Sequence, residues 1–137
     1  MVINGPGRGI EREQRGTTVV LRINRPEVRN ALDNAARISL GRCIQKAEED
    51  PSVRAIVLTG TGDRAFCAGM DLREFTQGGA RALPPEEMAP YFRFMRQGTS
   101  KPVIGAANGS AVAGVSNCCS PVTLWSPSST RCLLFPR

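Results

Sequence analysis

The sequence predicts an α/β fold, and three features carry that prediction. Residues 17–24, TTVVLRIN, alternate between two sides in the manner of a strand. Residues 53–60 and 101–109 are short apolar runs that end in glycine-bearing turns, as buried strands do. A helical apolar pattern separates the first two strands, and strand, helix, strand is α/β organisation.

The composition indicates one modest globular domain. The chain has 137 residues, of which 41% are hydrophobic and 22% are charged, and no apolar run approaches the roughly 20 residues that span a bilayer. Residues 1–15 are charged and glycine-rich and lack the apolar core of a signal peptide, which predicts a flexible arm and a cytoplasmic protein. The net charge is +6, but the arginines are scattered singly without interleaved aromatic residues, so no nucleic-acid partner is expected.

The first strand should end before Pro26, because proline cannot continue a sheet ladder. Asp33 is a suitable N-cap for a helix that continues to about Glu49, where the Asp-Pro pair at 50–51 stops it. Gly41 should weaken this helix by roughly 1 kcal/mol relative to alanine. One apolar stripe follows the helical period: Ala36, Leu40, Cys43, Ile44 and Ala47.

After the second strand, a glycine-bearing turn leads into a helix start at Asp71. A flexible loop, residues 76–85, separates it from a longer helix that should end at Gly98. The side chains expected on the core face of that longer helix are Met88, Phe92 and Met95.

Five cysteines raise the question of a metal or a disulfide. Two of them, Cys43 and Cys67, precede residue 115, and the other three lie in the last 23 residues. A disulfide framework is not expected in a chain without a signal peptide. Adjacent cysteines in a chain without histidine do not suit zinc, so we expect no metal site.

Two turns of small residues are candidates for a binding site. In AFCAGMDL, residues 65–72, Ala68 and Gly69 precede a helix start, where unpaired backbone N–H groups point outward. The turn NGSAVAG, residues 108–114, could present a second N–H group. Two converging amides form an oxyanion hole, which stabilises negative charge on a carbonyl oxygen. Each turn by itself is more typical of a plain tight turn.

Three segments taken together resemble the enoyl-CoA hydratase/isomerase family, the crotonases. They are TVVLRINRPEVRNALD, AIVLTGTGDRAFCAGMDL and SKPVIGAANGSAVAG, and the resemblance covers residues 16–114. It implies a crotonase-like spiral of ββα units, which would be incomplete in this chain. Members of the family usually assemble as trimers or hexamers. The resemblance further implies acyl-CoA thioester partners, with coenzyme A as part of the substrate and no separate cofactor.

The resemblance also implies roles for particular residues. The thioester oxygen would accept hydrogen bonds from the backbone amides of Ala68 and Gly114. Cys67 precedes the first of these donors, and although a thiol near a helix N-terminus can be nucleophilic, a small filler role is favoured. The implied substrate-binding residues are Val28, Arg29, Ala68, Gly69, Met70 and Asp71.

The catalytic glutamates of the family's hydratases are missing from the expected positions. One glutamate should follow the second oxyanion glycine by three residues, and the other should come twenty residues later; these positions hold Asn117 and Arg137. Asparagine cannot take a proton from water, and arginine stays protonated. Impaired catalysis is therefore expected. A divergent homologue with other chemistry, or a non-catalytic fragment that binds CoA thioesters or subunits, is an alternative.

Residues 115–137 differ from the rest of the chain. They contain five serines, three prolines and three cysteines, no acidic residue, and no persistent helix or strand period. Read one base earlier, their codons permit GFELLLACDLVVAVEHALFAFPE, which looks like the next stretch of a crotonase and has glutamate at both expected positions. We therefore hypothesise a frameshift at or just before codon 115, which would make this tail aberrant and the chain truncated. Acyl-chain specificity, and hydratase against isomerase chemistry, stay open.

Overall fold

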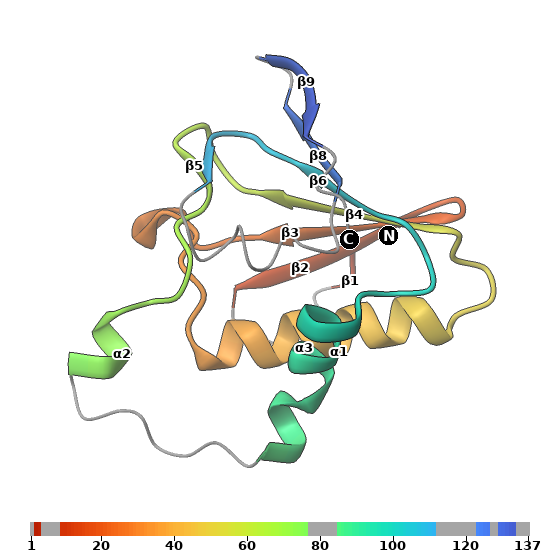
Figure 1. Ribbon diagram of the computed structural model, residues 1–137, viewed down its shortest axis with the longest axis horizontal. Helices are drawn as coiled ribbons and strands as arrows, with labels where there is room; N and C mark the ends of the chain where they lie inside the picture. Colours follow the sequence, from red (N-terminus) through yellow and green to blue (C-terminus); the bar gives the residue numbers. More distant parts are fainter. Residues whose placement is uncertain (1, 4–8, 77–84, 112–122, 127–128, 134–137) are drawn as a thin grey trace.

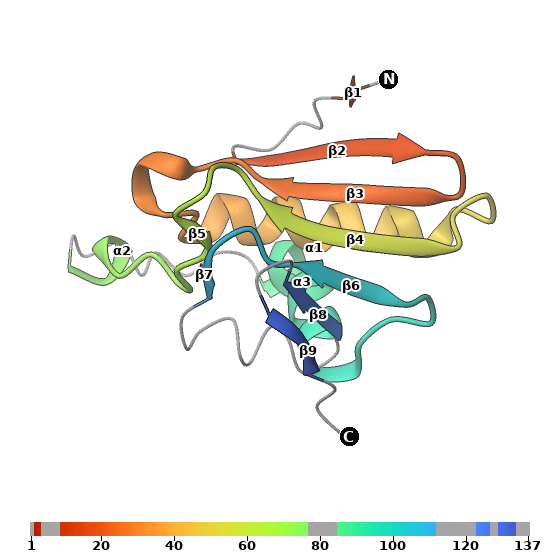
Figure 2. The same cartoon turned by 90° about the horizontal axis from the view of Figure 1, so that it is seen from above.

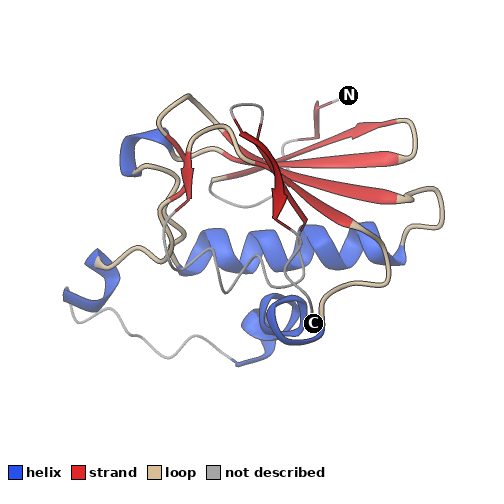
Figure 3. Ribbon diagram, turned by 45° about the horizontal axis from the view of Figure 1, so that its top comes forward, coloured by secondary structure: helices blue, strands red, loops and turns tan. Residues whose placement is uncertain are grey.

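The computed structural model describes residues 2–3, 9–76, 85–111, 123–126 and 129–133. Within this part of the chain, a twisted sheet is covered on one face by two long helices (Figure 1). Turning the molecule shows the longer helix running beneath the central strands (Figure 2). The helices and the sheet thus form layers around one core (Figure 3). The predicted α/β class is confirmed.

The main sheet has seven strands among the described residues, in the order β1-β2-β3-β4-β6-β8-β9. The pairs from β3 to β8 are parallel, and the outer pairs on both sides are antiparallel. A separate parallel pair joins β5 to β7. The strand bounds are β1 (Val2–Ile3), β2 (Ile10–Arg15), β3 (Thr18–Ile23), β4 (Ala55–Gly60), β5 (Ala65–Cys67), β6 (Val103–Ala106), β7 (Ser110–Ala111), β8 (Thr123–Ser126) and β9 (Ser129–Leu133).

Helix α1 (Asn34–Glu49) is the connection between the parallel strands β3 and β4. The Asp33 carboxylate accepts a hydrogen bond from the Ala36 amide at 2.8 Å, so the predicted N-cap is confirmed. All five residues of the predicted apolar stripe are buried. At the other end, the Lys101 ammonium donates to the carbonyls of Ala47 and Asp50 at 2.8 and 2.5 Å, which satisfies carbonyls that the helix leaves unpaired.

The core lies between α1 and the alternating inward side chains of the parallel strands. Residues on this face of the sheet are almost completely removed from solvent, because every second residue of a strand points to the same side. They include Val19, Leu21, Ile23, Ile56, Leu58 and Val103.

The prediction of a flexible arm over residues 1–15 is wrong for residues 10–15, which form β2. β2 pairs antiparallel with all six residues of β3, and Gly16, at φ 59°, makes the turn between them. Only Ile10 of β2 is buried, so the strand carries no alternating apolar pattern. Backbone pairing with β3 forms it, and pairing does not depend on side-chain type.

The core face predicted for the second long helix is also partly wrong. Helix α3 (Pro85–Gln97) buries Met88, Tyr91 and Phe94, whereas Phe92 is 44% exposed. Met95 packs against the core as predicted. The buried residues recur every three positions, which turns the stripe away from Phe92 and toward α1.

The absence of regular structure predicted for 115–137 is contradicted at two places. β8 pairs parallel with β6, and β9 pairs antiparallel with β8. A strand at the edge of a sheet offers unpaired N–H and C=O groups to any neighbouring segment. Pairing with β6 therefore organises residues that show no period of their own.

Candidate functional site

The turn that follows β5 lies at the carboxyl end of the parallel strands, where α/β folds commonly place binding sites (Figure 1). It is fastened to the loop after β3 by three backbone hydrogen bonds. The Leu32 amide donates to the Gly69 carbonyl at 2.8 Å, and the Asp71 amide donates to the Leu32 carbonyl at 3.0 Å. The Ala68 amide donates to the Arg29 carbonyl at 3.1 Å. Two segments that were candidates from sequence therefore lie side by side.

The amides of this turn differ in what they bind. Because the Ala68 amide already donates to the Arg29 carbonyl, Ala68 is not the free donor that the family resemblance implied. The Gly69 amide faces the Cys67 sulfur at 3.4 Å. The Met70 amide has no hydrogen-bond partner among the described residues, and Met70 is 41% exposed. Met70 therefore supplies the available donor of this turn.

The loop that carries Val28 and Arg29 has an unusual backbone. A 3₁₀ turn, η1 (Pro26–Val28), is followed by Arg29 and Asn30 in the left-handed region, at φ 53° and 57°. Left-handed backbone at two successive non-glycine residues is uncommon and needs support from surrounding contacts. Here the Val28 carbonyl accepts from the Ala31 amide at 3.1 Å. The Arg29 carbonyl is thereby positioned to accept from the turn after β5.

Asp71 is buried, at 7% exposure, and its charge is balanced by two arginines. The Arg73 guanidinium lies 2.9 Å from its carboxylate and the Arg25 guanidinium lies 3.7 Å away. The hydrogen bond from Arg73 lowers the pKa of Asp71 below its ordinary value. Asp71 is therefore an ionised structural anchor of the turn rather than a proton donor.

Cys67 is 1% exposed, within the core. Its sulfur accepts from the amide two residues ahead. A buried thiol in this position fills space beneath the turn, which supports the filler role over the nucleophile.

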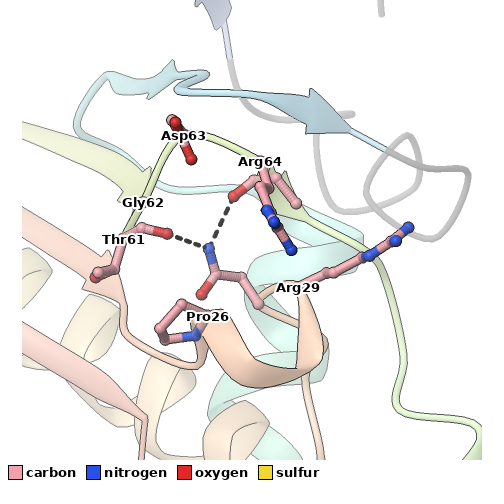
Figure 4. A pocket seen from close by; sticks show the side chains of 8 residues that line it. Pro26, Arg29, Thr61, Gly62, Asp63 and Arg64 are labelled. Carbon is pink, nitrogen blue, oxygen red and sulfur yellow. Dashed lines mark hydrogen bonds between the residues drawn. The ribbon is translucent and has the colours of Figure 1, made fainter.

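A pocket of about 290 Å³ lies between the loop after β3 and the loop that joins β4 to β5 (Figure 4). Its walls carry two guanidinium groups, Arg29 and Arg64, against one carboxylate, Asp63. The excess of positive charge favours an anionic ligand. The lining residues are Pro26, Arg29, Asn30, Thr61, Gly62, Asp63, Arg64 and Ala65.

A second groove, of about 440 Å³, lies between α1 and α3. Its lining includes Glu48, Glu86 and Arg93. None of the sequence-predicted site residues lines it.

Two residues of the site were missed in the sequence. Asn30 and Asn108 bind the backbone of the loop between β4 and β5. Each stands beside a predicted turn, and an asparagine in such a place is a signal for side-chain-to-backbone bonding. Gly114, Asn117 and Arg137 lie outside the described residues, so the second amide donor and both expected glutamate positions stay predictions.

The architecture defines the class of protein first. The solved structure of a carnitinyl-CoA dehydratase from Mycobacterium avium matches with a TM-score of 0.76 and 37% identity, over 86% of this chain and 46% of that one. The fold is accordingly that of the crotonases, present here in part. The sequence profile described as enoyl-CoA hydratase/isomerase matches residues 13–119. The chain belongs to the enoyl-CoA hydratase/isomerase family.

Curated relatives agree with this assignment. Mevalonyl-coenzyme A hydratase sidH of Aspergillus fumigatus is 36% identical over 105 residues, which cover 73% of this chain and 38% of that protein. The mitochondrial enoyl-CoA hydratase of Pongo abelii is 36% identical over 104 residues, covering 76% of this chain and 35% of the relative. The chain therefore spans well under half the length of these relatives. Within its described residues, no helix is both long and apolar enough to cross a membrane.

Proposed function

We propose that the chain binds acyl-CoA thioesters and places the thioester oxygen against the backbone amide of Met70. The observation that carries this proposal is the Met70 amide, which has no partner among the described residues, in a turn whose other amides are engaged. An amide held in place before the ligand arrives stabilises charge on a carbonyl oxygen without reorganising. Gly114 is proposed as the second donor, on the family resemblance.

The pocket lined by Arg29 and Arg64 suits the phosphate groups of the CoA part of the ligand. Coenzyme A carries phosphate groups, and guanidinium groups bind phosphate through charge-assisted hydrogen bonds. Arg29, from the loop after β3, and Arg64, from the loop between β4 and β5, both line this pocket. Binding there would run the acyl-CoA from the Arg29 side toward Met70.

Hydration of an enoyl thioester needs groups that move protons as well as an oxyanion hole. The positions proposed for those groups hold Asn117 and Arg137, which cannot act as bases. We therefore propose that this chain binds acyl-CoA without hydrating it.

We propose that residues 115–137 result from a shifted reading frame. The family match ends at residue 119, five residues beyond Gly114. The shifted frame permits Asp-Leu-Val-Val at 123–126, the residues that form β8 beside β6. The coding sequence through codons 112–140 is the direct test. A stop codon in the shifted frame, or the lack of glutamate at codons 117 and 137, would rule the shift out.

Calorimetric titration with butyryl-CoA tests the binding proposal. Saturable binding that depends on the Met70 amide supports it. No binding by the folded chain would exclude it.

A further inference from the structure

The three segments that carry the family resemblance meet at one atom, the carbonyl oxygen of Ala65. The Asn30 side-chain amide donates to this oxygen at 2.8 Å, and the Asn108 side-chain amide donates to it at 3.3 Å. Asn30 belongs to the loop after β3, and Asn108 belongs to the turn between β6 and β7. One carbonyl thus joins three stretches that are far apart in the sequence.

Both side chains also bind other backbone groups of the loop between β4 and β5. Asn30 donates to the Thr61 carbonyl at 3.0 Å, as drawn in Figure 4. Asn108 donates to the Gly62 carbonyl at 2.6 Å and accepts from the Gly60 amide at 3.0 Å. An asparagine side chain has one acceptor and two donor hydrogens, so the two residues bind this loop with nearly all their capacity.

Close packing leaves no room for a side chain at Gly60 or Gly109. A Cβ atom at Gly60 would lie 2.8 Å from both asparagine side chains, and one at Gly109 would lie 2.7 Å from the Ala65 nitrogen. Asn30 is also 1% exposed, so losing its partners would leave a buried polar group unsatisfied. The loop is therefore held tightly at the start of β5.

We propose that Asn30 and Asn108 are positioning residues for the acyl-CoA site. β5 begins at Ala65 and pairs with β7 through Ala65–Ser110 and Cys67–Ala111. At its far end it delivers the turn that carries the Met70 amide. The two asparagines set where β5 sits against β7, and β7 leads along the chain toward Gly114.

A small displacement of the Met70 amide would weaken its hydrogen bond to a thioester oxygen. A misplacement on the order of 1 Å, introduced far from the reacting atoms, can cost about a hundredfold in an enzyme. The two asparagines would therefore affect the part of the affinity that comes from the thioester carbonyl. They would not affect the part that comes from the CoA moiety. This inference rests on the proposed function.

The test compares binding of butyryl-CoA with binding of S-butyl-CoA, a thioether that lacks only the carbonyl oxygen. Full-length wild type, Asn108→Asp and Asn30→Asp are titrated with both ligands. Aspartate keeps the acceptor and the size but removes the donors to the backbone carbonyls. We expect the preference for the thioester to fall by about three- to tenfold, the range of one net hydrogen bond, while S-butyl-CoA binding changes little.

Lys101→Met is the matched control, because Lys101 fastens the far end of α1. It should lower thermal stability and leave the thioester preference unchanged. Asn108→Ser, which retains one donor, serves if an aspartate variant does not fold. Folded asparagine variants that keep the full preference would overturn the positioning role and leave the proposed function intact. A wild-type chain without any preference would overturn both.

Discussion

Asp71 is a buried carboxylate whose ionised state is part of the fold. Its Oδ1 accepts from the Arg73 amide and side chain, both at 3.1 Å, and Arg25 links it to Asp33. Hydrogen bonds from Arg73 lower the pKa of Asp71, and the ion pairs of Arg25 tie the turn after β5 to the N-terminus of α1. Asp71 thus has a structural role in the turn, and the substrate contact that the family resemblance implies for it stays a prediction.

Asp71→Asn should lower the free energy of unfolding at neutral pH by about 1–2 kcal/mol. Hydrogen bonds to a charged group contribute about 1.5–3 kcal/mol, and the 62% exposure of the Arg73 side chain reduces this through solvent screening. Because the folded-state pKa is lowered, this stability is present above the unfolded value of about 3.9 and is lost as pH falls through the folded value.

Urea denaturation across this pH range checks the prediction. The gap between wild type and Asp71→Asn should narrow as the solution becomes more acidic. Asp63→Asn, at an exposed loop position, is the control and should run parallel to wild type. A gap that does not change with pH would contradict an electrostatic role for Asp71.

At the scale of elements, α1 and α3 approach closely where α1 has a glycine. A Cβ atom at Gly41 would lie 2.8 Å from the Tyr91 Cα, which is backbone and cannot rotate away. The sequence indicated only the cost of a glycine within a helix. The packing reason is invisible there, because it depends on a second helix that begins about 40 residues later in the chain.

Gly41→Ala should therefore destabilise the protein by about 1–3 kcal/mol, the usual cost of overpacking a core. Helix propensity alone predicts the opposite sign, a gain of roughly 1 kcal/mol. Thermal or urea unfolding distinguishes the two. Arg42→Ala, at the adjacent exposed position, should change stability by less than about 0.5 kcal/mol. A stabilised Gly41→Ala would show that the helices do not cross closely at this point.

Some helices and strands were predictable from the sequence, whereas β2 and the buried face of α3 were not. β3 and α1 were predictable because their side chains alternate or recur with the period of the structure that they form, and β4 and β6 because each is a short apolar run that ends in a glycine-bearing turn. β2 was not, since its residues after Ile10 remain partly exposed and pairing alone holds it. The face of α3 was misjudged at Phe92 because a helical stripe can be drawn through more than one set of apolar residues.

For the site, the motifs located the turn but not its donor. The quoted segments placed the turn at 68–71, and the structure shows that this turn hydrogen-bonds to the loop at 29–32. Which amide is available depends on the hydrogen bond from Ala68 to Arg29, a contact between distant segments. Asn30 and Asn108 stand beside predicted turns, but the distant backbone groups that they bind, such as the Ala65 carbonyl, were visible only after folding.

At the scale of the whole molecule, the chain contains the part of a crotonase fold in which we propose the first amide donor, Met70. It spans 46% of a solved relative's length. The groups that would move protons are assigned to positions 117 and 137, where the sequence has Asn117 and Arg137. Binding and catalysis should therefore separate in this protein.

The separation can be measured with crotonyl-CoA. The chain should show no hydration above background, whereas protein expressed from a coding sequence with the frame restored at codon 115 should hydrate it. Loss of absorbance by the conjugated enoyl thioester reports the reaction. Hydration by the chain as it stands would contradict the predicted impairment, and an inactive restored protein that is folded would contradict the frame assignment.

The most direct test of the binding proposal is removal of the Met70 amide. Proline at position 70 deletes that N–H group, while the backbone bonds on either side, through Gly69 and Asp71, remain possible; Met70 is not among the residues with positive φ. In titrations with butyryl-CoA, Met70→Pro should bind about tenfold or more weakly than wild type, and Met70→Leu should bind like wild type. Equal affinity of wild type and folded Met70→Pro would contradict binding through this amide.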